Sequence, residues 1–208
     1  MNPTLTHEQA LDLLGKHGIT EKVAWIGLRS KDSVYGEKDA YTDTAVLVTP
    51  DGIQSFKFNT LPTVWKQDIA CLVPGLYMWK KGIHGMHHLS LKKNDDGTWQ
   101  NQEDVDAYNW LLSHVGQDHP DPNYRLIYWA FREVPPMTVI RCGHSGTFTD
   151  NAASPYYIDG HHGGFVSTSS ESCQTWPPAI WHQVRAAGYD AMDKYNQSEI
   201  PYLLELVD

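Results

Sequence analysis

Alternation between hydrophobic and polar positions predicts that this chain consists mainly of β-strands. Residues 53–58 alternate with period two, residues 44–49 are largely apolar, and Pro50-Asp51-Gly52 lies between them, which is typical of a β-hairpin. Hydrophobic or aromatic stretches bounded by turn-forming residues predict further strands along the chain. These lie within residues 23–28, 71–83, 89–93, 98–100, 125–134, 137–142, 156–158 and 202–207.

Helical periodicity predicts helices near both ends of the chain. Thr6 with Gln9 three residues later is a capping-box pattern, and apolar residues follow it, so we expect a helix at 7–16. A pair of prolines starts a second pattern, which predicts a helix at about 178–196. A shorter pattern predicts a further helix at 104–114.

The order of these elements predicts one α+β domain that is mainly β. We expect a mixed β-sheet with a sandwich-like core, an N-terminal helix, and a C-terminal helix that follows the loop containing Cys173. Polar, glycine-bearing residues predict a long loop at 143–155. No repeat or linker divides the sequence, so residues 1–208 are predicted to form a single domain with a catalytic core at about 44–208.

Charge and cysteine usage disfavour several classes of protein. The chain has 16 Lys and Arg against 25 Asp and Glu, and no basic cluster occurs, so we expect no nucleic-acid partner. The three cysteines are far apart and form no CxxC pair, which argues against a disulfide framework and a thiolate zinc site. The sequence shows no signal peptide and no membrane-spanning run, so we expect synthesis in the cytoplasm. We expect no cofactor.

Residues 156–176 contain the strongest candidate for chemistry. His161 and His162 are followed by two glycines, a run of small hydroxyl residues and then Cys173. A nucleophilic thiol needs a base to remove its proton and donors to stabilise an oxyanion. Because its sequence neighbours are polar, we expect Cys173 in an accessible loop, with a histidine of this stretch folded back against it as the base.

The same stretch supplies candidates for the other parts of such a site. Gly163 and Gly164 allow close approach of the backbone. Ser170 and Ser172, together with backbone amides around the cysteine, are the candidate oxyanion donors. Candidate substrate-binding residues, chosen for their charge or position, are His84, His162, Arg132, Arg29 and Arg185.

The segment Ser170-Glu171-Ser172-Cys173 resembles the Ser/Thr-His-Gly-Cys signature of the L,D-transpeptidase (YkuD-type) family, in which a histidine also lies upstream. Residues 73–77 are similar, more loosely, to the Pro-Thr-Gly-x-Tyr entry strand of that family. Two positions depart from the signature, because Glu171 stands in place of its histidine and Ser172 in place of its glycine. The resemblance covers residues 73–88 and 156–185.

The resemblance implies a cysteine acyl-transfer enzyme that acts on the stem peptides of peptidoglycan. It implies that Cys173 is acylated, that His161 is the base and is oriented by a backbone carbonyl, and that Ser170 fills the small hydroxyl position. Both hydrolysis and transpeptidation are compatible with these residues. The pattern is also similar to that of phage and bacterial proteins, including endolysins, which act on the cell wall after release.

Three alternatives stay open. A zinc-dependent hydrolase would use histidines as metal ligands, with candidates at His84, His87, His88, His144, His161 and Asp159. A non-catalytic phage structural or cell-wall-binding module would use exposed aromatics among the 8 tryptophans and 11 tyrosines, unless these pack in the core. A glycosidase would need two converging carboxylates, and the sequence singles out no pair.

Overall fold

The computed structural model describes residues 4–31, 41–62, 69–88, 91–102, 104–106, 109, 125–143, 146–152, 158–163, 170 and 172–207. The chain divides into two compact units. The first consists of Met1–Gly82 with Ala130–Asp208, and the second of Ile83–Trp129. The prediction of a single domain over residues 1–208 concerns folding as one unit and stays a prediction.

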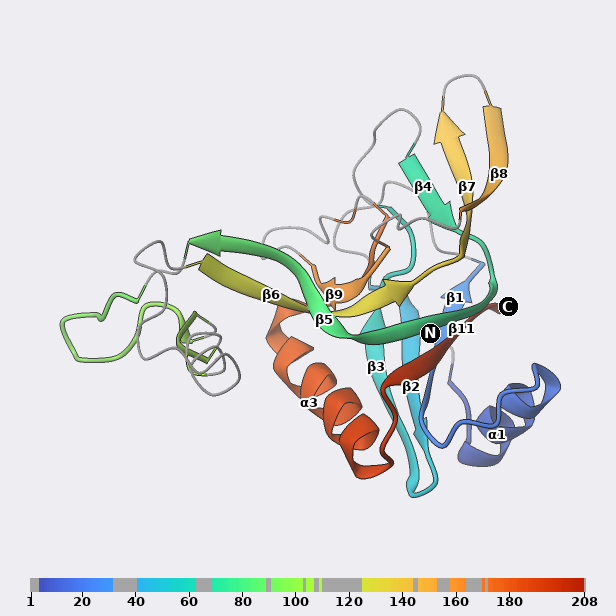
Figure 1. Cartoon of the computed structure of the whole chain (residues 1–208), viewed down its shortest axis with the longest axis horizontal. Coiled ribbons are helices and arrows are strands. Elements are labelled where there is room, and N and C mark those ends of the chain that lie inside the picture. The colour runs from blue at the N-terminus through green and yellow to red at the C-terminus, as the bar shows by residue number, and fades with distance from the viewer. Residues whose placement is uncertain are drawn as a thin grey trace. The chain divides into compact units, whose positions relative to one another are not determined.

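The described elements confirm the predicted fold class, which is mainly β with a helix near each end of the chain (Figure 1). The named helices are α1 (His7–Lys16) and α3 (Pro178–Lys194). The named strands are β1 (Ala24–Ser30), β2 (Asp43–Thr49), β3 (Gly52–Phe58), β4 (Ile69–Leu72), β5 (Gly75–His88), β6 (Arg125–Val134), β7 (Met137–Gly143), β8 (Gly146–Ala152), β9 (Gly160–His162), β10 (Gln174–Trp176) and β11 (Glu199–Val207).

The larger sheet curves until its two outer strands meet. Its order is β10-β9-β6-β5-β11-β1-β2-β3, with parallel pairing of β1 to β11 and of β9 to β10. Asn59, which follows β3, and Thr175 of β10 exchange two backbone N–H···O hydrogen bonds of 2.8 Å each. A smaller sheet has the order β4-β7-β8. The mixed pairing predicted from the sequence is therefore present.

Helix α1 begins where the capping-box pattern predicts. The Thr6 hydroxyl accepts a hydrogen bond from the Gln9 amide at 3.2 Å, and the Gln9 side chain accepts one from the Thr6 amide at 2.8 Å. Ala10 and Leu14 are buried in a cluster that includes Ile26 of β1. The apolar face of α1 is thus held against one face of the sheet.

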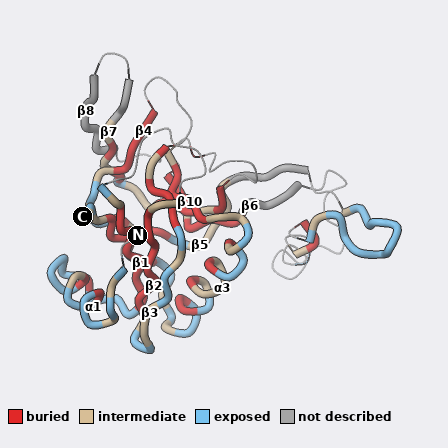
Figure 2. Tube along the Cα trace, turned by 180° about the vertical axis from the view of Figure 1, so that it is seen from behind, coloured by how far each residue is buried: buried red, intermediate tan, exposed pale blue. Residues whose placement is uncertain are grey.

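Helix α3 packs on the opposite face of the same strands (Figure 1). Trp25 is the neighbour of Ile26 in β1, but its side chain points to the opposite face of the sheet, because successive side chains of a strand alternate between faces. It lies beside α3, where a Cβ added to Gly188 would be 3.2 Å from the Trp25 ring. Strand β1 is therefore buried along most of its length, as Figure 2 shows.

An aromatic cluster fills the face of the sheet that α3 covers. Its fully buried members are Trp25, Phe58, Trp79, Phe131, Trp176 and Tyr202. The rings of Trp79 and Tyr202 stack with 3.8 Å between centroids, and Trp181 of α3 lies 5.5 Å from Trp176. These aromatics serve the core rather than an exposed binding surface.

Tyr189 of α3 holds together the two points at which the chain leaves and re-enters the first unit. Its hydroxyl donates to the carbonyl of Ala130 at 2.7 Å and accepts from the amide of Gly82 at 3.2 Å. Burial raises the pKa of Tyr189 to about 12, so the hydroxyl stays protonated and able to donate at neutral pH. One side chain thereby links β5 to β6 at the boundary of the unit.

In the second unit, residues 91–100 form a tight turn. The amide of Asn94 donates to the carbonyl of Thr98 at 2.7 Å, and an isolated bridge joins the flanking residues. Of the hairpin predicted here, the described residues form a turn with one bridge, and residues 89 and 90 lie outside the described residues. Within the helix predicted at 104–114, residues 104–106 and 109 are helical and the others lie outside the described residues.

Several predicted boundaries are wrong. Strand β5 continues through His88, beyond the predicted end at residue 83. Strand β8 occupies much of the predicted loop 143–155, because all seven of its residues pair with β7 despite their polar character. Of the strand predicted at 156–158, residues 156 and 157 lie outside the described residues and Ile158 is not in a strand. β9 begins at Gly160, and neither it nor β10 was predicted.

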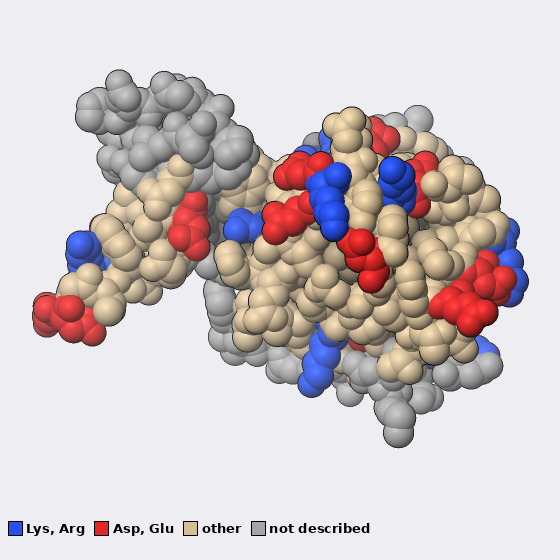
Figure 3. All heavy atoms as spheres, turned by 90° about the horizontal axis from the view of Figure 1, so that it is seen from below, with Lys and Arg blue, Asp and Glu red and all other residues tan. Residues whose placement is uncertain are grey.

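The described surface of the first unit carries charges of both signs. Figure 3 shows acidic side chains interspersed with basic ones on the face that it presents, without a continuous basic area among the described residues. None of the described helices is long and apolar enough to cross a membrane.

The close packing of α3 predicts opposite effects for alanine at two helical glycines. A Cβ on Gly188 would lie 2.5 Å from the Phe131 ring, so Gly188→Ala should destabilise the fold by about 1–3 kcal/mol although alanine favours helices. Gly15 of α1 has open space around it, so Gly15→Ala should stabilise by about 0.5–1 kcal/mol. Urea denaturation measures both values, and equal stabilisation by both substitutions would contradict the packing.

Candidate functional site

The candidate site lies where β9 and β10 run side by side in the first unit. The two short strands pair in parallel, with Gln174 opposite Gly160 and Thr175 opposite His161. Cys173 directly precedes β10, and the amide of the next residue, Gln174, donates to the carbonyl of Asp159 at 2.9 Å. Backbone pairing therefore brings the predicted nucleophile and base together from neighbouring strands.

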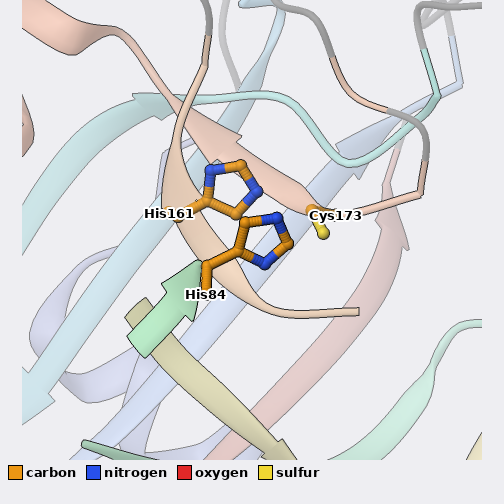
Figure 4. A group of neighbouring side chains, drawn as sticks. All are labelled: His84, His161 and Cys173. Atoms are coloured by element: carbon orange, nitrogen blue, oxygen red, sulfur yellow. The ribbon is translucent and has the colours of Figure 1, made fainter. Parts of the chain in front are cut away.

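His161 and Cys173 are close enough for proton transfer after a small adjustment. A ring nitrogen of His161 lies within 4.8 Å of the Cys173 Sγ atom. Figure 4 shows the imidazole pointing from β9 toward the cysteine side chain. Catalytic hydrogen bonds are often long before substrate binds, so this distance suits a base and its nucleophile.

A backbone carbonyl fixes the orientation of the His161 ring. The Nδ1 atom of His161 lies 2.5 Å from the carbonyl oxygen of His162. A carbonyl can only accept, so Nδ1 carries the proton of this hydrogen bond. In the neutral ring the proton on Nδ1 leaves Nε2 as the acceptor, which is the form that a general base requires.

Cys173 is buried, and the prediction of an accessible loop position is wrong. Its exposed fraction is 7%. Burial raises the pKa of Cys173 to about 12, and the negative charges of Asp159 and Glu133 add to this effect. A backbone hydrogen bond at Asp159 and the charge of Arg132 act in the opposite direction. The thiol is therefore protonated at neutral pH.

Two buried carboxylates stand behind the cysteine. Asp159 is fully buried, accepts a hydrogen bond from the Glu133 amide at 2.9 Å and forms an ion pair with Arg132 at 3.2 Å. The Glu133 carboxylate in turn accepts from the Ile158 amide at 3.0 Å. Asp159 is thus bound to two residues of β6 and also lies beside the thiol. Arg132, a predicted substrate-binding residue, is engaged with this carboxylate.

The predicted oxyanion donors have other partners. The Ser170 hydroxyl is buried and donates to the Cys173 carbonyl at 2.6 Å, so it orients the cysteine backbone. The Gly163 amide donates to the Trp176 carbonyl at 2.8 Å and is not available to an oxyanion in this conformation. Ser172 is half-buried beside the cysteine. Gly164 lies outside the described residues.

The other predicted residues are distributed as follows. His162 is buried, and its Nδ1 atom lies 2.7 Å from the Gly163 carbonyl. His84 is half-buried near the end of β5, where Figure 4 labels it, and it belongs to the second unit. The site is therefore defined by His161 and Cys173, which both belong to the first unit. Among the alternative zinc ligands, His144 lies outside the described residues.

A buried polar network underlies β10 and was not predicted from the sequence. The Arg29 guanidinium donates to the hydroxyl of Thr60 at 2.7 Å and to its carbonyl at 2.9 Å. The Thr60 hydroxyl and amide both donate to the Asp43 carboxylate, at 2.6 and 2.8 Å. Burial lowers the pKa of Arg29 from its usual value. Arg29 and Asp43 lie in β1 and β2, whose other residues are mostly apolar, which is the one sequence signal that could have indicated this network.

Gln174 connects this network to the candidate site. Its side chain donates to the Thr60 carbonyl at 3.3 Å and accepts from the Tyr202 hydroxyl at 2.8 Å. Because Gln174 directly follows Cys173, the same contacts fix the backbone of the cysteine from inside the sheet. The predicted nucleophile therefore directly precedes a strand that is fixed on both sides.

Compared with protein-family models, curated proteins and solved structures, the chain matches none of them.

The raised pKa of Cys173 predicts how its reactivity depends on pH. Iodoacetamide should label Cys173 slowly at pH 7, and the rate should keep rising by about tenfold per pH unit up to at least pH 11. The thiolate fraction of an ordinary cysteine levels off above a pKa of about 8.5. Mass spectrometry of the peptide that contains Cys173 measures the rate, with the chain unfolded in urea as the control. A plateau near pH 9 in the folded protein would contradict the burial of the thiol.

Proposed function

We propose that the chain is a cysteine acyl-transfer enzyme that acts on a peptide amide. The observation that carries the proposal is the pairing of Cys173 with His161, whose ring nitrogen lies within 4.8 Å of Sγ and whose Nδ1 atom is anchored to a carbonyl. The carbonyl anchor is what the resemblance to L,D-transpeptidases implies for the base. The substrate class, a peptidoglycan stem peptide, comes from that resemblance alone.

The protonated state of the thiol defines the order of events. Cys173 Sγ attacks the carbonyl carbon of the scissile amide, and the thiol proton moves to Nε2 of His161 as the carbon–sulfur bond forms. The tetrahedral intermediate then expels the amine, which takes the proton from His161 and leaves a thioester. Water or a second amine attacks the thioester and regenerates the thiol. Hydrolysis and transpeptidation differ only in this last acceptor.

General-base assistance is essential in this environment. Burial and the charge of Asp159 disfavour a free thiolate, so a preformed thiolate–imidazolium pair is not the resting state. His161 must therefore accept the proton during attack. Ser172 is the candidate oxyanion group among the predicted serines, because the Ser170 hydroxyl is used by the Cys173 carbonyl. Backbone amides of the cysteine segment complete the set of candidates.

Digestion of crosslinked peptidoglycan tests this function, with products identified by mass. We expect Cys173→Ala to abolish stem-peptide cleavage or exchange, and His161→Gln to lower kcat by about 10²–10⁴-fold because general-base assistance is lost. His182→Gln is the matched control, since His182 is exposed on α3 and should leave activity unchanged. The product masses also distinguish water from an amine as the acyl acceptor.

Two outcomes would overturn the proposal. Equal activity of wild type and Cys173→Ala would exclude the cysteine mechanism, and loss of that activity with a chelator would indicate a zinc-dependent hydrolase. Binding of peptidoglycan without any product would indicate a cell-wall-binding module.

A further inference from the structure

An ion pair of the first unit lies beside the candidate nucleophile. A guanidinium nitrogen of Arg132 and a carboxylate oxygen of Asp159 are 3.2 Å apart. Asp159 is fully buried, whereas 22% of the Arg132 side chain is exposed. Burying a charge is costly even when the charge is paired, so stability alone is a weak reason for such a pair. The acyl-transfer steps proposed above use neither charge.

Backbone pairing places Asp159 level with Cys173. Strands β9 and β10 run parallel with Gln174 opposite Gly160, so one step back along both chains brings Asp159 beside the cysteine. The amide of Gln174 donates to the carbonyl of Asp159 at 2.9 Å, which continues the ladder to this point. The buried carboxylate and the thiol are therefore neighbours on adjacent segments.

Strand β6 fixes the orientation of the Asp159 carboxylate. One of its oxygens accepts a hydrogen bond from the amide of Glu133 at 2.9 Å, and the other forms the ion pair with Arg132. Phe131 of the same strand pairs with Gly160, so β6 lies alongside β9. The two oxygens are thus held by two successive residues of one strand, and the negative charge stays beside the thiol.

The alkyl stem of Arg132 is placed by a glycine of β5. A Cβ added to Gly82 would clash with Cγ of Arg132, so the absence of a side chain at Gly82 makes room for the stem. The stem packs against this backbone while the guanidinium reaches Asp159. Arg132 is therefore positioned both by packing and by its charge.

The two members of the ion pair act on Cys173 in opposite directions. Burial and the negative charges of Asp159 and Glu133 favour the protonated thiol, whereas the positive charge of Arg132 favours the thiolate. Within the first unit, His161 is the other titratable group beside the thiol, and Figure 4 shows its ring directed toward the cysteine. A carboxylate that keeps the proton on sulfur leaves that proton for the imidazole to take during attack.

We propose that Asp159 and Arg132 are positioning residues with opposed effects, in which Asp159 keeps the proton of Cys173 on sulfur until His161 receives it and Arg132 limits this hold. The inference rests on the proposed function only in taking His161 as the acceptor of the proton. An ion pair that merely held β9 against β6 would have no such direction, because loss of either partner would loosen the same contact. The sign of the effect therefore distinguishes the two roles.

Alkylation of Cys173 by iodoacetamide at about pH 9 tests the inference without a substrate. Asp159→Asn should raise the rate and Arg132→Gln should lower it. A fall of about one in the thiol pKa raises the thiolate fraction about tenfold but lowers thiolate nucleophilicity about threefold, so each such step changes the rate by about threefold. The combined variant should label at a rate between those of the two single variants.

Two controls separate charge from loosening of the fold. Arg132→Lys keeps the positive charge and is expected to label Cys173 at the wild-type rate. Cys71, which is buried in β4 of the smaller sheet, is the internal reference, because a general loosening would raise its labelling as well. Mass spectrometry of the two cysteine peptides measures both rates in one sample.

The outcomes separate this inference from the proposed function. Shifts of the same sign in both single variants, or no shift in either, would overturn the opposed charges even if Cys173-dependent cleavage of peptidoglycan is observed. If Asp159→Asn does not fold, Arg132→Gln decides alone, and labelling as fast as that of Arg132→Lys would overturn the inference. Opposite shifts support it even if the wild type cleaves nothing, in which case the acyl-transfer function fails alone.

Discussion

The hydrogen bonds around Thr60 are the constraint on which the candidate site depends. Its hydroxyl and carbonyl both accept from Arg29 of β1, its hydroxyl and amide donate to Asp43 of β2, and its carbonyl also accepts from Gln174 of β10. β1 and β2 thus meet β10, which lies at the far end of the sheet order, at one residue. Because an unpaired group in this interior would cost about 1–3 kcal/mol, these contacts define where β10 begins. Cys173 is positioned as a consequence.

Burial distinguishes this cysteine from the exposed, readily ionised thiol of a typical reactive cysteine. An exposed thiol beside a cation is a ready nucleophile but is also readily oxidised or alkylated. Here the neighbouring Asp159 and Glu133 oppose ionisation, whereas His161 is held by the His162 carbonyl with one nitrogen left to accept a proton. Under the proposed function, this arrangement would keep the thiol inert until a substrate carbonyl and the base are aligned. Selectivity would then come from substrate placement rather than from intrinsic thiolate reactivity.

Local secondary structure was predictable from the sequence, whereas burial and strand pairing by distant residues were not. The capping box at Thr6 and the hairpin around Pro50 depend on neighbours in the chain, and both appear as expected. Strand β8 was missed because its pairing with β7, not its own pattern, makes it a strand. Cys173 has polar sequence neighbours, but β9 and two distant carboxylates surround it. The periodicity of a sequence does not show which distant residues will bury a given side chain.

The link made by Tyr189 has a consequence for how this chain can vary. Gly82 and Ala130 contact one hydroxyl, so the 47 residues Ile83–Trp129 begin and end at nearly the same place. A segment with adjoining ends behaves as an insertion in a hairpin, and its length is not constrained by the body that carries it. The first unit, with its aromatic core and its cysteine, can therefore keep its architecture while that segment is shortened, enlarged or exchanged in evolution or by design.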